Sequence, residues 1–274
     1  MQRSSARQAE RVFVAEGTTS VQSALVAGAP IEGIYVAPEW RASKAASLVV
    51  ERAAVAGHRV HELAAGVMEK VADTVTPQPV CAIVGALDVG LEDIVAPLPA
   101  QFGASPALSP DGAPSRYATP PVLVCVDVRD PGNLGAVLRS AGASGAGAVV
   151  CCSGGVDPYN PKAVRASAGA IFHVPIVVGV TPTETLSALS AAGYRCWATV
   201  PAGGTDYLVA ELGGPTAFVL GNESKGLDDK TRALLDGALT IATSEPTESL
   251  NVAMAATVLC FEMARRRRAG LPVP

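Results

Sequence analysis

The chain has 274 residues, of which 49% are hydrophobic and 17% charged, and these proportions are ample for one or two buried cores. The formal net charge of −4 argues against indiscriminate binding to nucleic acid. No apolar run is long enough to span a bilayer, and the polar first residues are not followed by the apolar core of a signal peptide. We therefore expect a cytoplasmic protein that does not bind membranes.

Residues 1 to about 97 alternate short strand-like runs with helical stretches, which predicts a small α/β domain. The expected strands are 33–36, 59–62 and 80–84, and the expected helices are 19–27 and 42–56. Arg3, Arg7 and Arg11 recur at helical spacing near the amino end and form a local positive patch. Residues 98–120 are rich in Pro, Ala, Ser and Gly, a composition that is typical of a linker.

Residues 121–274 alternate apolar strands with helical patterns, which predicts a mostly parallel sheet covered by helices on both faces. The expected strands are 122–127, 148–153, 195–200, 217–221 and 239–243. The expected helices span about 133–144, 160–168, 183–192, 228–236 and 249–266. Because the last of these is apolar on several faces, we expect it to be buried in the core or against another subunit.

The segment 128–141 contains the first of three strand-loop-helix transitions. We expect Pro131 and Gly132 to form the turn and Asn133 to cap the following helix, with Arg139 six residues further on. Segments 218–227 and 240–253 are two further apolar strands that run into polar loops. Open α/β folds bind ligands at the edge of the sheet where the carboxyl ends of the strands lie, so the three loops are candidates for one site.

Several other motifs favour plain structural roles. The glycine-rich segment 142–147 lacks the spacing of a dinucleotide fingerprint and is interpreted as a helix C-cap and turn. No phosphate-binding loop motif is present. The six cysteines (81, 125, 151, 152, 196 and 260) lack zinc-like spacing with the histidines and are interpreted as buried reduced thiols, so no metal site is expected.

In order and spacing, the three transitions resemble the three motifs of the SpoU-type (TrmH-like) RNA 2′-O-ribose methyltransferases, a family of the knotted SPOUT superfamily. Segment 7–17 is similar to the opening of the longer members, which carry a ribosomal-protein-like RNA-binding domain. The resemblance implies an RNA substrate-binding domain at 1–97 and a catalytic domain at 121–274 with a deep trefoil knot. It further implies S-adenosylmethionine as cofactor, RNA (favoured: ribosomal RNA) as substrate, and a homodimer formed through the knotted domain.

Carried over by position, the resemblance assigns catalytic positions to Asn133, Arg139, Glu223, Ser249 and Asn251. The cofactor pocket is expected from Thr199, Val200, Leu220, Gly221, Asn222, Ile241, Ser249 and Leu250, with Gly221 allowing close approach of the ligand and Ile241 and Leu250 enclosing the adenine. Contacts with RNA are expected from Arg7, Arg11, Arg139 and Arg165. Arg139 would orient the ribose and its 3′ phosphate and lower the pKa of the hydroxyl; whether it also takes the proton stays open.

Structural alternatives stand beside these assignments. Glu223 could serve as a helix-cap acid, and Ser249 and Asn251 could cap the final helix. The run Arg265–Arg268 either complements a helix C-terminus or contacts phosphate. At the level of function, the alternatives are a transfer-RNA 2′-O-methyltransferase, a methyltransferase acting on a base nitrogen, and a non-catalytic RNA-binding or ribosome-assembly protein that keeps the fold.

Overall fold

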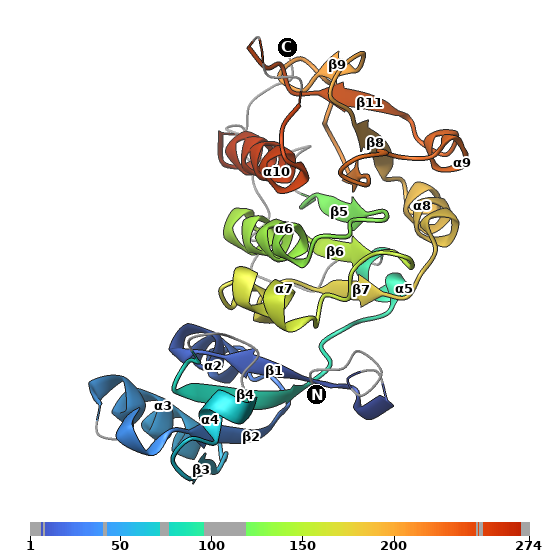
Figure 1. Ribbon diagram of the computed structural model, residues 1–274. Coiled ribbons are helices and arrows are strands. Elements are labelled where there is room, and N and C mark those ends of the chain that lie inside the picture. The colour runs from blue at the N-terminus through green and yellow to red at the C-terminus, as the bar shows by residue number, and fades with distance from the viewer. Residues whose placement is uncertain are drawn as a thin grey trace.

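Two α/β units follow one another along the chain, each built around its own sheet (Figure 1). The computed structural model describes residues 7, 9–40, 43–71, 77–95, 119–244, 246 and 249–269. The predicted linker at 98–120 therefore lies outside the described residues except for its last two. Within the described part, no helix has both the length and the apolar composition needed to cross a bilayer.

The first unit has a four-stranded sheet in the order β1-β4-β2-β3. Its elements are β1 (Val12–Glu16), α2 (Thr18–Val26), β2 (Ile31–Val36), η1 (Pro38–Trp40), α3 (Lys44–Val55), β3 (Val60–Glu62), α4 (Met68–Val71) and β4 (Val80–Gly85). The predicted strands and helices are confirmed within a few residues. Strand β1 was not predicted, because it is buried on both faces and lacks the alternation of polar and apolar residues that marks a half-exposed strand.

The second unit has a seven-stranded sheet in which every pairing is parallel, in the order β7-β6-β5-β10-β8-β11-β9. The strands are β5 (Val122–Cys125), β6 (Ala148–Cys151), β7 (Ile176–Val178), β8 (Arg195–Thr199), β9 (Thr205–Asp206), β10 (Thr216–Leu220) and β11 (Gly237–Thr240). The predicted parallel sheet is thus confirmed. The two edge strands β7 and β9 were not predicted, because two or three residues carry too little pattern.

Helices cover both faces of this sheet (Figure 1). One face carries α6 (Pro131–Ser144), α7 (Pro161–Ala166), η3 (Ala170–Phe172) and α10 (Val252–Ala269), and the other carries α5 (Leu91–Val95) and α8 (Pro182–Ala191). The short helix α9 (Asp229–Arg232) precedes β11. In α10, the inward face is buried, but Met254 is 62% and Phe261 44% exposed, so the all-round burial expected for this helix holds only on one side.

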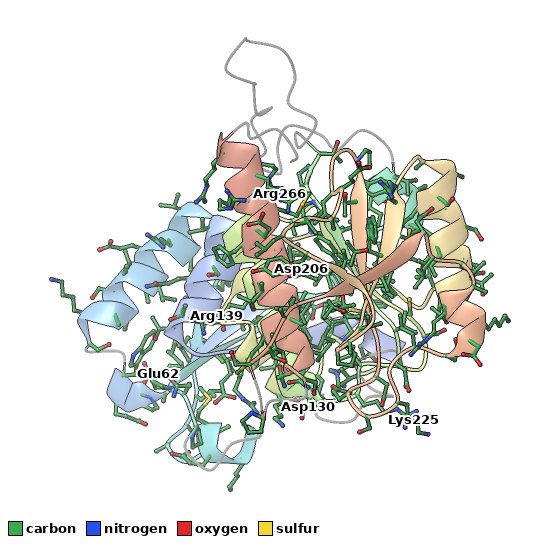
Figure 2. All side chains as sticks on the ribbon, turned by 90° about the horizontal axis from the view of Figure 1, so that it is seen from above. Glu62, Asp130, Arg139, Asp206, Lys225 and Arg266 are labelled. Carbon is green, nitrogen blue, oxygen red and sulfur yellow. The ribbon has the colours of Figure 1, made fainter. Side chains whose placement is uncertain are left out.

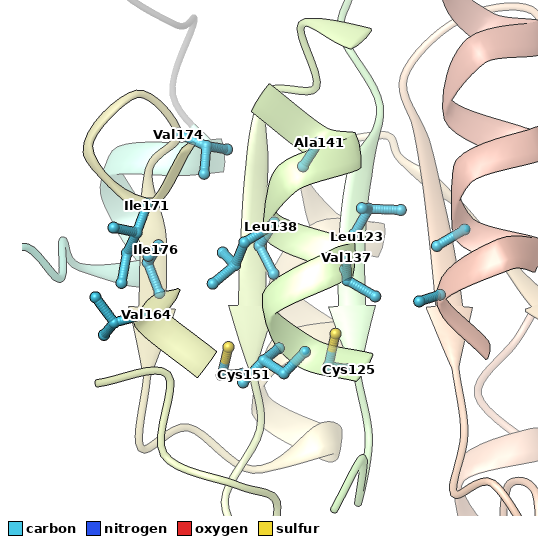
Figure 3. Close-up of a cluster of buried hydrophobic side chains, with 14 of the residues drawn as sticks. Leu123, Cys125, Val137, Leu138, Ala141, Cys151, Val164, Ile171, Val174 and Ile176 are labelled. Atoms are coloured by element: carbon cyan, nitrogen blue, oxygen red, sulfur yellow. The ribbon is translucent and has the colours of Figure 1, made fainter. Parts of the chain in front are cut away.

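Successive buried side chains along each strand point to opposite faces of the sheet, as parallel strands covered on both faces require. In β5, Leu123 and Cys125 face α6, where Val137 and Leu138 pack on them (Figure 3). Val122 and Val124 face the opposite way, toward α5 and α8. Each such fully buried aliphatic side chain contributes about 1.5–3 kcal/mol. All six cysteines are buried and free, as predicted.

The start of α6 differs from the prediction. Asp130, not Asn133, is the N-cap, and its side chain accepts a hydrogen bond from the Asn133 backbone N–H at 2.8 Å. Pro131 and Gly132 form the first turn of the helix and not the turn before it, because proline is well suited to the first helical position. At the other end, Gly145 adopts a left-handed conformation with φ 69°, which confirms the predicted C-cap.

The two units pack closely on each other. Phe13 of β1 stacks on Tyr159 with ring centroids 4.8 Å apart, and on Phe172 at 5.9 Å. Arg165 of α7 forms an ion pair with Glu16 of β1 at 3.4 Å. Residues 88–95 pack on the second sheet, since Asp88 forms a bridge with Ile176 and α5 contributes Ile94 to its core. A common apolar core therefore joins the units.

Candidate active site

The loops of the three predicted transitions converge at the carboxyl edge of the seven-stranded sheet. Between the ends of β8, β10 and β11, the second and third of these loops and the segment after β8 enclose a cavity of about 470 Å³, hereafter the main cavity; the first loop contributes no lining residue. All eight residues predicted to hold the cofactor line it: Thr199, Val200, Leu220, Gly221, Asn222, Ile241, Ser249 and Leu250. Glu223 and Asn251 also line it. Segments that lie up to about fifty residues apart in sequence thus form one hollow.

A chain of hydrogen bonds joins the three loops. The Asn133 side-chain amide donates to the Glu223 carboxylate at 2.9 Å, and the Asn251 amide donates to the Asn133 carbonyl oxygen at 2.9 Å. Asn251 also accepts from the backbone N–H of Ala253 at 2.9 Å and so caps α10. The capping and the site interpretations of Asn251 are therefore compatible, because one side chain performs both tasks.

Glu223 is held by donors from the first loop. Besides Asn133, the backbone N–H groups of Asp130 and Arg129 donate to its carboxylate at 3.3 and 3.4 Å. Partial burial by itself raises the pKa of Glu223, but these hydrogen bonds outweigh it, so that the pKa lies below its usual value. Glu223 is therefore ionised at neutral pH and, in this structure, binds the loop before α6 and caps no helix of its own.

Asn222 clamps the second loop. Its amide donates to the Asp127 carbonyl oxygen at 3.0 Å and to the Asp127 carboxylate at 3.2 Å, which holds Asp127 at φ 53°. Asn222 and Gly226 exchange backbone hydrogen bonds, and a Cβ on Gly221 would lie 2.7 Å from the Gly226 carbonyl carbon. The glycine at 221 is thus required by closure of its own loop, whereas the sequence interpretation had attributed it to approach of a ligand.

Arg139 lies apart from the main cavity. It follows Asn133 by six residues, about 9 Å along the helix axis, and is not among the residues that line the cavity. Its side chain is exposed and makes no hydrogen bond or ion pair within the described part of the chain. The neighbouring Ser140 bonds to Thr257 of α10 at 2.6 Å, and Figure 2 shows Arg139 beside this helix, away from Asp130 and Lys225 at the loop edge.

The other predicted RNA contacts have different surroundings. Arg7 is 6% exposed and pairs with Asp157 at 2.6 Å, and Arg165, whose side chain is 29% exposed, pairs with Glu16, so both join the two units. The side chain of Arg11 is 64% exposed and pairs with Asp88 at 3.0 Å. Arg3 lies outside the described residues.

The arginine run at the end of α10 is largely structural. Arg266 is 3% exposed, pairs with Glu262 at 2.6 Å, and donates to the carbonyl oxygens of Tyr207, Leu208 and Ala210. Arg267 donates to the Ser144 carbonyl at the end of α6. For these two residues the structural interpretation is the better one, because both bind backbone carbonyl oxygens of other segments.

The main cavity fits a ligand with a flat apolar part and polar groups. Leu220, Ile241 and Leu250 supply apolar wall, and Thr199 Oγ1 is buried there without a hydrogen-bond partner within the described residues. The sequence interpretation missed the remaining lining residues, which are Pro201, Ser224, Lys225, Gly226, Arg232, Thr243, Val252 and Ala255. Most of them adjoin predicted positions in the same loops, but only the fold brings Arg232 of α9 to this place.

Known proteins match both units. Residues 120–261 match the model of the SpoU rRNA Methylase family, and residues 1–82 match that of the MRM3-like substrate binding domain. A 23S rRNA (uridine(2479)-2′-O)-methyltransferase from Streptomyces viridochromogenes is 36% identical over 145 residues, which are 51% of this chain and 50% of the relative. The chain spans about half the length of the first curated relatives that it matches.

Two solved structures extend the likeness to nearly the whole chain. The SpoU methyltransferase AviRb from Streptomyces viridochromogenes, crystallised with AdoMet, has a TM-score of 0.77 at 25% identity and covers 97% of this chain and 94% of its own. An AdoMet-bound rRNA methyltransferase from Sinorhizobium meliloti has a TM-score of 0.77 at 26% identity, with 97% and 91% covered.

Proposed function

Because this chain belongs to the SpoU rRNA methylase family, we propose that it methylates a ribose 2′-hydroxyl of ribosomal RNA with S-adenosylmethionine as the methyl donor. The observation that carries the proposal is the main cavity, which Glu223 and Asn251 line and whose loops are joined to the first loop through the hydrogen bonds of these two side chains with Asn133. Proteins with this fold include a SpoU methyltransferase in complex with AdoMet and an AdoMet-bound rRNA methyltransferase, which supports the choice of both cofactor and substrate.

The residues of the main cavity suit S-adenosylmethionine, which supplies an activated methyl group when bound. Leu220, Ile241 and Leu250 would enclose the adenine with apolar surface. The Thr199 hydroxyl, which has no hydrogen-bond partner among the described residues, would bond to a polar group of the cofactor. Asn133, Glu223 and Asn251 hold the surrounding loops in place before the ligand arrives, which lowers the ordering cost of binding.

Removal of the ribose hydroxyl proton is assisted by Arg139. We assign its guanidinium, a planar donor of hydrogen bonds, to orienting the ribose and the 3′ phosphate and to lowering the pKa of the 2′-hydroxyl. Glu223 is already committed to three donors of the first loop and acts as a positioning residue. Transfer of the methyl group to the 2′-oxygen would break the S–CH3 bond of the donor and the O–H bond of the ribose, releasing S-adenosylhomocysteine and a proton that passes to solvent.

A homodimer accounts for the position of Arg139. In one subunit this residue does not line the main cavity, but it lies on α6 beside α10, where Met254 and Phe261 leave apolar surface exposed. We propose that two copies pair through α6 and α10, so that Arg139 of each reaches the main cavity of the other. Mixing the inactive Arg139→Ala and Leu250→Asp variants should then restore activity, and failure of the mixture to do so would argue against the shared site.

The knot expected from the family fits the strand order. Strand β10 lies between β5 and β8, and the loops that follow β10 and β11 both line the main cavity before α10 packs on α6. We propose that the segment leading to α10 passes through the loop formed by the preceding strands as a deep trefoil knot. A folding rate that is slow for a domain of this size, with no proline-isomer dependence, would support the threading.

We assign RNA binding to residues 1–97 and catalysis to residues 121–274, with 98–120 as the linker. The match of residues 1–82 to the MRM3-like substrate binding domain supports the first assignment, and the match of 120–261 supports the second. A substrate of bacterial ribosomal RNA would place the reaction in the cytoplasm.

The proposed activity is tested with labelled S-adenosylmethionine and separate pools of ribosomal and transfer RNA. We expect label in ribosomal RNA. The phosphodiester bond after the labelled nucleotide should resist cleavage by alkali, because the 2′-oxygen is blocked. Label confined to transfer RNA would correct the substrate, and label on a base would correct the target atom. Absence of label with tight RNA binding would favour the non-catalytic alternative. By calorimetry, Leu250→Asp should abolish cofactor binding, and unchanged affinity would refute the assigned pocket.

A further inference from the structure

A second cavity, of about 350 Å³, lies at the same edge of the sheet. The segments 151–159 and 178–179, at the ends of β6 and β7, form most of its lining. Residues from the first part of the chain, among them Arg11 and Asp88, close one side. It shares no lining residue with the main cavity. The second cavity is therefore a separate hollow at the junction of the two units.

The two cavities flank the first loop. The strand order places the second cavity over β7 and β6, the loop before α6 over β5, and the main cavity over β10, β8 and β11. The Val156 backbone N–H donates to the Val128 carbonyl oxygen at 2.9 Å, so the wall of the second cavity touches this loop. The next residues, Arg129 and Asp130, bind Glu223 through their backbone N–H groups. An RNA strand lying along this edge of the sheet would pass both cavities.

Arg11 sits at the mouth of the second cavity in a fixed position. Its Nη2 donates to Asp88 at 3.0 Å, and Asp88, only 13% exposed, also accepts from the Tyr159 hydroxyl at 3.1 Å. The backbone of Arg11 has φ 54°, a conformation that non-glycine residues seldom adopt and that is maintained by the surrounding structure. Its other N–H groups make no hydrogen bond within the described residues. This arrangement leaves part of a guanidinium fork facing solvent, which suits a phosphate.

The interior suits a flat ring. Gly154, Gly155 and Gly179 leave backbone uncovered by side chains, and Val156 and Val178 are half-buried apolar groups. We propose that the second cavity holds one nucleotide of the RNA strand that adjoins the methylated nucleotide, with its base against these residues and its phosphate on Arg11. This inference rests on the proposed RNA methylation and adds to it a subsite that selects the sequence or conformation of the neighbouring nucleotide.

A side chain that fills the second cavity provides the first test. Ser153 is exposed at the cavity, and its backbone N–H bonds to Val180, so Ser153→Tyr can occupy the hollow without breaking that bond. Ser187→Tyr on the exposed side of α8 is the matched control. With ribosomal RNA transcribed in vitro and no methyl donor, we expect at least tenfold weaker binding for Ser153→Tyr alone, with unchanged affinity for S-adenosylmethionine. Equal RNA affinity of the two variants would overturn the proposal.

The phosphate contact and the neighbouring position are tested separately. Arg11→Gln should weaken RNA binding and reduce the slope of log Kd against log salt concentration by about 1, and an unchanged slope would contradict the contact. Because all six native cysteines are buried, Ser153→Cys introduces one accessible thiol for a photo-crosslinker. We expect crosslinks within a few nucleotides of the methylated position. Crosslinks elsewhere, with methylation intact, would refute the subsite alone, whereas absence of methylation by the wild type would overturn the proposed function and the subsite with it.

Discussion

Replacement of Asn133 by alanine would remove the residue that connects the first loop to the two loops of the main cavity. It breaks the 2.9 Å bond to the Glu223 carboxylate and the 2.9 Å bond from Asn251. A hydrogen bond to a charged group contributes about 1.5–3 kcal/mol and a neutral one about 0.5–1.5 kcal/mol. Because Glu223 is exposed, water compensates in part, and the lower ends of these ranges apply.

The total is about 2 kcal/mol, which corresponds to about a 30-fold change in an equilibrium constant. We expect the loss to appear as weaker binding of S-adenosylmethionine, because the ligand must then order the loops that Asn133 holds in the wild type. Titration calorimetry measures this directly. Thr181→Ala, which breaks the capping box of α8 on the opposite face of the sheet, is the matched control. If both variants bind the cofactor like the wild type, the idea that the hydrogen-bonded chain preorganises the cavity is refuted.

Three further predictions concern charged residues. Because the folded-state pKa of Glu223 is lowered, the stabilisation from its carboxylate is present above the ordinary carboxyl pKa of about 4.3 and lost as the pH falls through the lowered value. Urea unfolding should therefore show that Glu223→Gln lowers the free energy of unfolding at pH 7 and does so much less at pH 3. A pH-independent difference would contradict the shift. Arg139→Ala should lower the methylation rate by about 100-fold or more with unchanged cofactor affinity, since we assign Arg139 to the ribose and its 3′ phosphate and not to the cofactor. Near-normal turnover would remove its assigned role. Arg266→Leu should lower the free energy of unfolding by about 3 kcal/mol or more, because Glu262 and three carbonyl oxygens lose a buried partner. Arg268→Leu, at an exposed position, serves as the control. Equal denaturation midpoints for the two variants would contradict the stabilising role of Arg266.

The sequence alone was sufficient for the five longer strands of the second sheet and for ten of the residues that line the main cavity. Strands such as β5 and β10 are continuous apolar runs, and each ends in a polar loop, so the pattern fixes both the strand and the edge at which ligands meet. Asn133, Glu223 and Asn251 could be named because their loops stand in a characteristic order. Their mutual hydrogen bonds could not be predicted, since these depend on side-chain directions that only the packed loops define.

Contacts between distant segments could not be predicted from the sequence. Arg7 and Arg165 were predicted to contact RNA, and in the structure they pair with Asp157 and Glu16 at the junction of the two units. No local spacing reveals a partner about 150 residues away. Arg266 illustrates the same point, because its carbonyl partners lie in a loop nearly sixty residues earlier.

The stacking of Phe13 on Tyr159 and the ion pair between Arg165 and Glu16 leave little freedom between the two units. The distance between the RNA-binding surface proposed for the first unit and the main cavity of the second is therefore fixed. An RNA fold gripped by the amino-terminal unit would present to the methylation site whichever nucleotide lies at a set span from the grip, so the target would be chosen by length as much as by base identity. Insertion of a base pair between the gripped fold and the target would then move the modification to a different nucleotide.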